Sequence, residues 1–253
     1  MRVWDLGSGR HMVAGAFSDL ALHHHPAVQI TVGGQGALTV TGADDRHDVC
    51  RLVVVGSGAR HAVRSDAKSK ALTLYFGLQT PQGDALNTLS RSRGRRGVWI
   101  VDDGQQLAEA TTALLDANGP HAAADFLVDQ LQGMAHQCSS ESRAVHPQLR
   151  QAIEVVSTRV PDHIDLASVA GAVALSPDYL GRLCKQQTGV SFSAAIRWQR
   201  LVTAIGHLVD GHSVTDAAHL AGFADGSHAN RVCWEMTGAA PREFAQAVRK
   251  TRI

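Results

Sequence analysis

The stretch RLCKQQTG at residues 182–189 returns as RVCWEMTG at residues 231–238. Arg, Cys, Thr and Gly occupy the same places in both copies. Each copy follows a short apolar segment and a turn, and each closes with a glycine, as helices commonly do. The C-terminal part of the chain is therefore predicted to be a duplicated helical unit.

The first unit is predicted to contain two short helices joined by a turn. Asp165 is a suitable N-cap for the first helix, and Ser176 is a suitable N-cap for the second. We expect Tyr179 and Leu180 to be buried on the inner side of the second helix, which should end at Gly189.

The second unit repeats this plan, with Ser213 or Thr215 as the first cap, Asp225 as the second and Gly238 at the end. Two such helices form a helix-turn-helix, whose second helix fits the major groove of DNA. The helix predicted between the units, over residues 193–209, would be roughly 25 Å long. It could hold two recognition helices near one turn of DNA apart, about 34 Å.

Over about residues 150–250 the chain resembles the AraC/XylS transcription regulators. The resemblance rests on SPDYLGRLCKQQTGVSF, on SVTDAAHLAGFADGSHANR, on TGAAPREF and on Arg200-Leu201 with Ala204 in the linking helix. In that family the second helix of each unit enters the major groove, so promoter DNA is the implied partner, and contact with RNA polymerase is implied with it. The DNA-binding residues that we carry over, with Lys185 as a further polar residue, are Asp178, Gly181, Arg182, Lys185, Gly226, Ser227, Asn230 and Arg231.

The chain departs from the family at several apolar positions. Cys184, Ala229 and Cys233 stand where the family usually has Phe. We expect the two cysteines to be small buried core residues. Trp234 is expected to fill volume that the missing Phe residues leave.

The N-terminal half has a different character, with alternating apolar and polar segments and Gly-rich turns typical of short strands. Two helical stretches follow at residues 104–117 and 122–137, and a polar linker at residues 138–147 ends in Pro. We predict an α+β protein: a β-barrel with helices over residues 1–140, and an all-α domain over residues 146–253.

Four side chains of the N-terminal half have a spacing that suits a metal. His23, His25 and Gln29 share one parity, so on a strand they project from one face, and His61 could face them from a neighbouring strand. Imidazoles suit Zn, Fe, Cu and Ni, and an amide oxygen can complete the ligand shell. The alternative is a pocket in which these side chains are polar groups without a metal.

These four residues also resemble the cupin metal motifs. His-x-His, three residues, Gln29 and then Gly36 match the first motif, with Gln where Glu is usual; Gly56-x-Gly58-x-x-His61 echoes the second. AraC-type regulators commonly carry a cupin-like sensing domain, so the resemblance implies a metal or small-molecule effector in the barrel.

The apolar residues on the other face of the strand that carries Gln29 must be shielded from water. Val28, Ile30 and Val32 have the opposite parity and need cover from the helices at 104–137 or from a second subunit. We favour a homodimer, because these helices carry more large apolar residues than one barrel face needs: Leu114, Leu115, Phe126, Leu127 and Leu131.

The composition is that of a globular protein, with 44% hydrophobic and 19% charged residues and a formal net charge of +1. No apolar run approaches the roughly 18–20 residues of a membrane span, and no signal peptide is evident, so we expect a cytoplasmic protein without a membrane partner. The four scattered cysteines favour reduced thiols.

The hypothesis is a non-enzymatic transcription regulator whose N-terminal barrel senses a metal or small molecule. One alternative is a metal-dependent cupin enzyme with a regulatory DNA-binding tail. Another is a DNA-binding protein whose barrel only mediates dimerisation.

Overall fold

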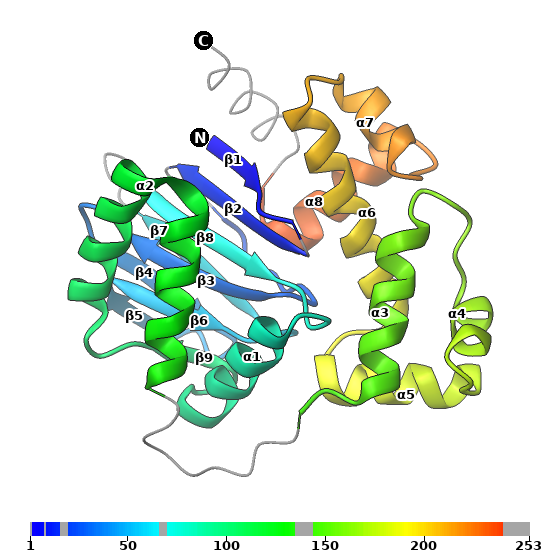
Figure 1. Ribbon diagram of the computed structural model, residues 1–253, viewed down its shortest axis with the longest axis horizontal. Helices are drawn as coiled ribbons and strands as arrows, with labels where there is room; N and C mark the ends of the chain where they lie inside the picture. Colours follow the sequence, from blue (N-terminus) through cyan, green and yellow to red (C-terminus); the bar gives the residue numbers. More distant parts are fainter. Residues whose placement is uncertain (1, 8, 16–19, 66–69, 135–143, 240–253) are drawn as a thin grey trace.

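The computed structural model describes residues 2–7, 9–15, 20–65, 70–134 and 144–239. It is an α+β protein, as predicted, with antiparallel sheets in the N-terminal half and helices in the C-terminal half (Figure 1). The linker predicted at 138–147 lies largely outside the described residues, and so does most of the TGAAPREF motif.

Six strands form the larger sheet, in the order β1-β2-β8-β3-β6-β9, with every pairing antiparallel. The long Val-rich segments form its central strands because β-branched side chains pack well on a pleated surface. The strand bounds are Arg2–Asp5 (β1), Arg10–Gly15 (β2), Val28–Gly33 (β3), Leu52–Val55 (β6), Ala71–Phe76 (β8) and Val98–Ile100 (β9).

The smaller sheet contains three antiparallel strands in the order β5-β4-β7. Their bounds are Leu38–Gly42 (β4), His47–Cys50 (β5) and His61–Ser65 (β7). The barrel is not closed, because in the described residues no named strand of one sheet pairs with a strand of the other. The expected barrel is therefore a two-sheet sandwich, with Leu38, Val40, Val53, Val55 and Val63 packed together.

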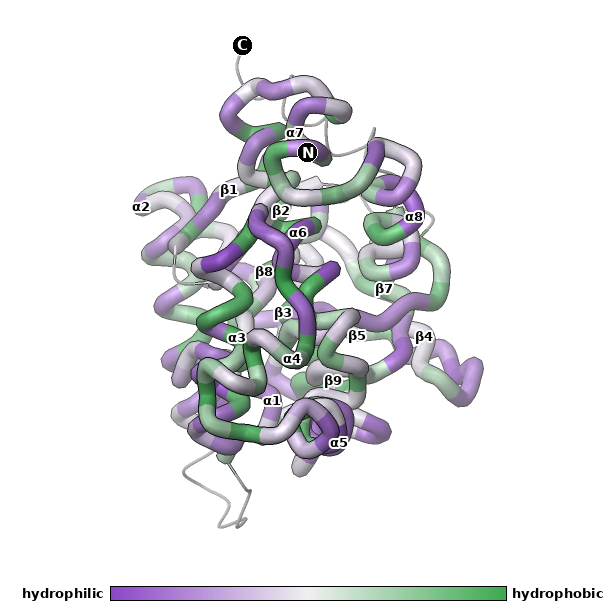
Figure 2. The backbone as a smooth tube through the Cα atoms, turned by 90° about the vertical axis from the view of Figure 1, so that its right-hand side faces the viewer, coloured by the Kyte–Doolittle hydropathy of each residue, from purple (hydrophilic) through white to green (hydrophobic). Residues whose placement is uncertain are grey.

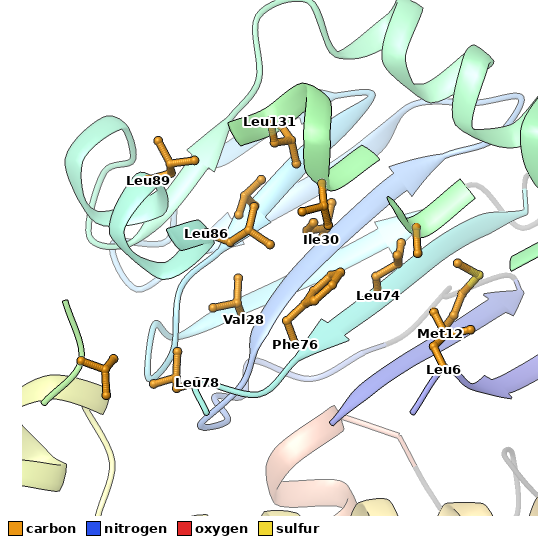
Figure 3. Close-up of a cluster of buried hydrophobic side chains, with 14 of the residues drawn as sticks. Leu6, Met12, Val28, Ile30, Leu74, Phe76, Leu78, Leu86, Leu89 and Leu131 are labelled. Atoms are coloured by element: carbon orange, nitrogen blue, oxygen red, sulfur yellow. The ribbon is translucent and has the colours of Figure 1, made fainter. Parts of the chain in front are cut away.

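Two helices cover one face of the larger sheet, α1 (Pro81–Arg93) and α2 (Gly104–Gly133) (Figure 1). Val28, Ile30 and Val32 of β3 are fully buried in the core that also contains residues of these helices. Figure 3 shows side chains of this core from the sheet and from both helices. Val28, Ile30 and Val32 are thus covered within one chain, and the alternate residues of β3 face the other way.

Helix α2 joins the two stretches predicted separately. It is kinked at Gly119, whose φ of 85° lies in the left-handed region, and Pro120 follows. The large apolar residues thought to favour a dimer pack against the sheet instead, with Leu127 and Leu131 fully buried. The homodimer stays a prediction.

The C-terminal helices have the predicted order, and their bounds are Pro147–Arg159 (α3), Leu166–Ala172 (α4), Pro177–Thr188 (α5), Phe192–Val209 (α6), Val214–Leu220 (α7) and Gly226–Thr237 (α8). In Figure 2 the tube of α3 alternates between hydrophilic and hydrophobic colours, as expected of an amphipathic helix. Asp165, Ser176, Ser213 and Asp225 cap α4, α5, α7 and α8 by accepting a backbone N–H.

Two predictions of burial on these helices are wrong. Tyr179 is 42% exposed and Trp234 is 51% exposed. The core beneath them is filled by Leu180 and Leu183 on α5 and by Cys233 and Met236 on α8. Cys184 and Cys233 are buried, as expected, and neither they nor Cys50 form a disulfide.

The two halves of the molecule are in direct contact. The Asp84 carboxylate of α1 accepts hydrogen bonds from the Val145 N–H and from Arg150 Nη2, the latter at 2.7 Å. Val3 and Val13 of β1 and β2 belong to the same apolar cluster as α6, α7 and α8. Over the described residues, no helix is both long enough and apolar enough to span a membrane.

Candidate functional site

The first candidate site is the pair of recognition helices, α5 and α8. All eight residues predicted to bind DNA lie on them. Asp178, Arg182 and Lys185 are exposed on α5. Ser227, Asn230 and Arg231 are exposed on α8, where Gly226 is the first residue and a Cβ added there would meet open space.

The repeat places Arg182 and Arg231 at equivalent positions. Each follows its helix N-cap by six residues, at Ser176 and at Asp225. An exposed guanidinium at this place can donate two hydrogen bonds to a guanine edge. The 18 residues of α6, which join the two units, make a helix of about 27 Å.

The second candidate site is a cluster of His23, His25, His61 and Gln29 in the N-terminal domain. The structure brings all four together, as predicted. One ligand atom from each histidine lies within 4.8 Å of the others. The four side chains are at most 3% exposed.

Each imidazole of the cluster is oriented by a backbone carbonyl. His23 Nδ1 lies 2.8 Å from the Ala21 oxygen, His25 Nδ1 lies 3.0 Å from that of Ala27, and His61 Nδ1 lies 2.9 Å from that of Ala59. A carbonyl can only accept, so the proton of each neutral imidazole stands on Nδ1. The three Nε2 atoms are left with lone pairs, which is the arrangement that second-shell carbonyls give to metal-binding histidines.

The polar groups around the three Nε2 atoms do not give each of them a hydrogen bond. Gln29 Oε1 lies 3.0 Å from His25 Nε2 and 3.1 Å from His61 Nε2, although none of these three atoms then carries a proton. Reversing the Gln29 amide would supply donors to both. It would still leave His23 Nε2, which is buried and has no hydrogen-bond partner. A cation among these atoms would satisfy all of them.

Burial keeps the cluster neutral. Desolvation lowers the pKa of His23 to about 4 and, together with the neighbouring His23, lowers the pKa of His25 to about 3. The same causes hold the pKa of His61 well below its ordinary value. Neutral imidazoles are the form that binds metals.

The cluster is covered by residues that the sequence did not point out. Trp198 of α6 lies with its ring centroid 5.1 Å from that of His25, and Tyr75 of β8 lies 5.3 Å from the same imidazole. No local pattern in the sequence marks either aromatic residue as a neighbour of a histidine.

A cleft of about 580 Å³ opens between the two halves of the molecule. Asp5, His11 and Gln79 line it from the N-terminal half, and Glu154 and Asp210 line it from the helical half. A smaller hollow of about 30 Å³ shares Gln79 with it and reaches Trp198.

Two helix-turn-helix units on one linking helix define a DNA-binding domain. Residues 169–247 match the helix-turn-helix domain family. The arabinose operon regulatory protein of Salmonella typhimurium is 34% identical over 109 residues, which are 41% of this chain and 39% of that protein. Its counterpart from Escherichia coli is 32% identical over 124 residues, 47% of this chain and 42% of that protein. The C-terminal part of the chain is therefore similar to these regulators, and the matches span about two fifths of the relatives' length.

Solved structures show that the fold extends over nearly the whole chain. Apo ToxT from Vibrio cholerae superposes with a TM-score of 0.69 at 13% identity, covering 96% of this chain and 98% of that one. Wild-type ToxT bound to an unsaturated fatty acid gives a TM-score of 0.63 at 14% identity, covering 97% of each chain. At such identities the likeness shows the fold alone.

Proposed function

We propose that this protein is a transcription regulator that binds promoter DNA through α5 and α8 and is controlled by a divalent transition metal bound at His23, His25, His61 and Gln29. The observation that carries the metal assignment is the buried Nε2 of His23, which has no hydrogen-bond partner and whose imidazole belongs to a group of three histidines with ligand atoms within 4.8 Å of one another. The observation that supports DNA binding is the repeated, exposed arginine on each recognition helix.

The donor set limits the choice of metal. Three imidazole nitrogens of intermediate softness outnumber the one harder amide oxygen, and such a set suits Zn, Ni, Fe or Cu rather than Ca or Mg. When bound, the metal would supply ligand bonds in place of hydrogen bonds. The chain's own contribution is to orient each imidazole through its carbonyl and to exclude water.

An enzymatic role fits the site less well than a regulatory one. A metal-dependent cupin enzyme needs a coordination position that substrate can reach. Here the ligands are at most 3% exposed, and Trp198 and Tyr75 lie against His25. Burial of this kind suits a sensor of the ion itself.

A second candidate effector is an organic molecule in the cleft between the halves. The ToxT structures include complexes with a fatty acid and with a substituted butenoic acid, both of which are carboxylic acids. The residues that line the cleft here include three acidic ones and neither Lys nor Arg. The cleft therefore favours an uncharged or cationic molecule over a carboxylate.

DNA binding is tested by selection. The full-length protein, loaded with Zn²⁺, is mixed with a pool of random-sequence duplexes, and the bound fraction is amplified and sequenced. We expect enrichment of a site with two elements about one helical turn, or 10–10.5 base pairs, apart. A pool that stays random after repeated selection would overturn the DNA-binding proposal.

A further inference from the structure

The repeat of residues 182–189 at residues 231–238 does more than duplicate a recognition helix. Each copy ends in Thr-Gly, at Thr188-Gly189 and at Thr237-Gly238, and both glycines adopt the left-handed conformation, with φ of 76° and 68°. Both turns lie against the N-terminal domain. The N-terminal domain therefore contacts the C-terminal ends of both recognition helices.

The first turn is held by a hydrogen bond and by backbone contact. Ser57 Oγ, in a side chain that is 4% exposed, donates to the Thr188 carbonyl at 2.7 Å. A Cβ built on Gly58 would lie 2.5 Å from the Thr188 oxygen and 2.8 Å from Gly189 Cα. The two backbones therefore touch with no room for a side chain between them.

The second turn makes an equivalent approach to a different segment. A Cβ built on Gly238 would lie 2.8 Å from the Ala21 oxygen and 3.0 Å from His23 Nδ1. That same Ala21 oxygen is the acceptor that orients the His23 imidazole. The end of α8 is thus in contact with a residue of the histidine cluster.

The two docking segments are the ones that carry the cluster. His23 and His61 exchange backbone hydrogen bonds, with both N···O distances 2.9 Å. The Gly58 N–H donates to the His25 carbonyl, also at 2.9 Å. The cluster therefore joins the segment beneath α5 to the segment beneath α8, and Trp198 contacts it from the helix between them.

We propose that the histidine cluster is a clamp: the bound metal fixes the two docking segments to each other and thereby sets the spacing of the two recognition helices. This inference rests on the proposed metal site. Without the ion, the two segments are joined by the backbone hydrogen bonds between His23 and His61 and from Gly58 to His25, and His23 Nε2 has no partner. With the ion, ligand bonds from both segments meet at one point, and the Thr-Gly turns carry that constraint to the DNA-reading surface.

The clamp requires that metal and DNA affect each other's binding by the same factor. We would measure Zn²⁺ content by mass spectrometry and DNA affinity by fluorescence anisotropy, using a duplex selected by the full-length protein, with Zn²⁺ present and after chelation. We expect the affinity of the wild type to differ at least about fivefold between the two states. DNA should shift the Zn²⁺ affinity by the same factor.

Gly58→Ala tests whether the first Thr-Gly turn connects the cluster to α5, because the added Cβ would push that turn away from the cluster. Gly7→Ala is the matched control, since Gly7 has nearly the same φ, 71° against 74°, and no neighbour within 4 Å of the added Cβ. We expect Gly58→Ala to bring the affinity ratio close to one and Gly7→Ala to leave it unchanged. If Gly58→Ala loses its Zn²⁺ or does not fold, Ser57→Ala, which removes only the hydrogen bond to Thr188, decides in its place.

The outcomes separate the clamp from the metal site. A wild type that never binds Zn²⁺ overturns both. A wild type that binds one Zn²⁺ per chain with an unchanged DNA affinity overturns the clamp and leaves the metal site standing. Full Zn²⁺ content with an undiminished affinity ratio in both Gly58→Ala and Ser57→Ala overturns the route through the turns.

Discussion

The indole of Trp198 lies against the imidazole of His25, with the two ring centroids 5.1 Å apart and the planes tilted by 31°. The first residue belongs to the helix that joins the two DNA-reading units, and the second belongs to the proposed metal site. A change at the histidine cluster therefore acts directly on α6, the helix that joins the two DNA-reading units.

This contact makes Trp198 a reporter of metal binding. Cu²⁺ quenches the fluorescence of an indole that lies within a few ångströms of it. We expect addition of one equivalent of Cu²⁺ to quench part of the emission of the wild type, which has four Trp residues. Trp198→Phe should lose most of this quenching, because no other Trp contacts the cluster among the described ring pairs.

Trp234→Phe is the matched control for this experiment. Trp234 is 51% exposed on α8, so its removal should lower the total emission and leave the Cu²⁺-dependent quenching in place. Equal quenching in the wild type and in Trp198→Phe would contradict the placement of the metal beside His25.

DNA recognition predicts a loss of affinity when either repeated arginine is truncated. Arg182→Ala and Arg231→Ala should each weaken specific binding by about 1–3 kcal/mol if the guanidinium contacts a guanine in two places. Folding should be unaffected, because both side chains are exposed. A gel shift at ~150 mM salt measures the change.

Arg159→Ala supplies the comparison, since Arg159 is an exposed arginine at the end of α3 and not on a recognition helix. Its effect on specific binding should be small. Binding by both recognition-helix variants at the wild-type level would show that α5 and α8 do not read the DNA through these side chains.

The neutral histidines make stability depend on pH in the metal-free protein. His23, His25 and His61 have lowered pKa values in the folded state and ordinary ones, near 6.5, when unfolded. Their contribution is fully present above pH 6.5 and is lost as pH falls toward about 4, because the unfolded chain takes up protons that the folded chain does not. The slope from three such groups is about 4 kcal/mol per pH unit near pH 5.

Urea unfolding with a chelator present, at several values of pH between 5 and 7.5, measures this slope. His61→Gln should reduce it by about one proton's worth, because it removes one of the three groups with a lowered pKa. A stability that is flat over this range would mean that the cluster is already charged or open to water.

Local signals predicted much of the helical half correctly. Ser176 and Asp225 cap their helices through their own side chains, so residues a few positions apart decide where α5 and α8 begin. Tyr179 and Trp234 were placed wrongly because burial depends on what the rest of the chain brings to a helix face. Helix α1 was not predicted, although Thr80 and Pro81 form a typical helix start, because its stretch carries few apolar residues.

The candidate metal site was predictable as a set of residues and not as a place in the molecule. The alternation of His23, His25 and Gln29 is a local property, and the glycines before His61 pointed to the fourth member. The contacts of Trp198, Ser57 and Gly238 with this region join segments far apart in the chain, so only the folded structure reveals them. Strand patterns alone likewise could not distinguish the expected closed barrel from the open two-sheet sandwich that the structure has.

His24 provides an internal control for the metal site. Its side chain is partly exposed, and it does not belong to the group of three converging histidines. His24→Ala should therefore keep the metal, whereas His61→Ala should lose it, because the three neutral ligands that remain include no carboxylate to compensate for the fourth.

The most direct test of the account is the metal content of the full-length protein, purified without a histidine tag and incubated in turn with Zn²⁺, Ni²⁺, Fe²⁺ and Cu²⁺. Mass spectrometry should find about one ion per chain for the wild type and for His24→Ala, and none for His61→Ala, with at least one of these metals. A wild type that stays empty with all four would contradict the metal site and would leave His23, His25, His61 and Gln29 as buried polar groups of an organic-effector protein.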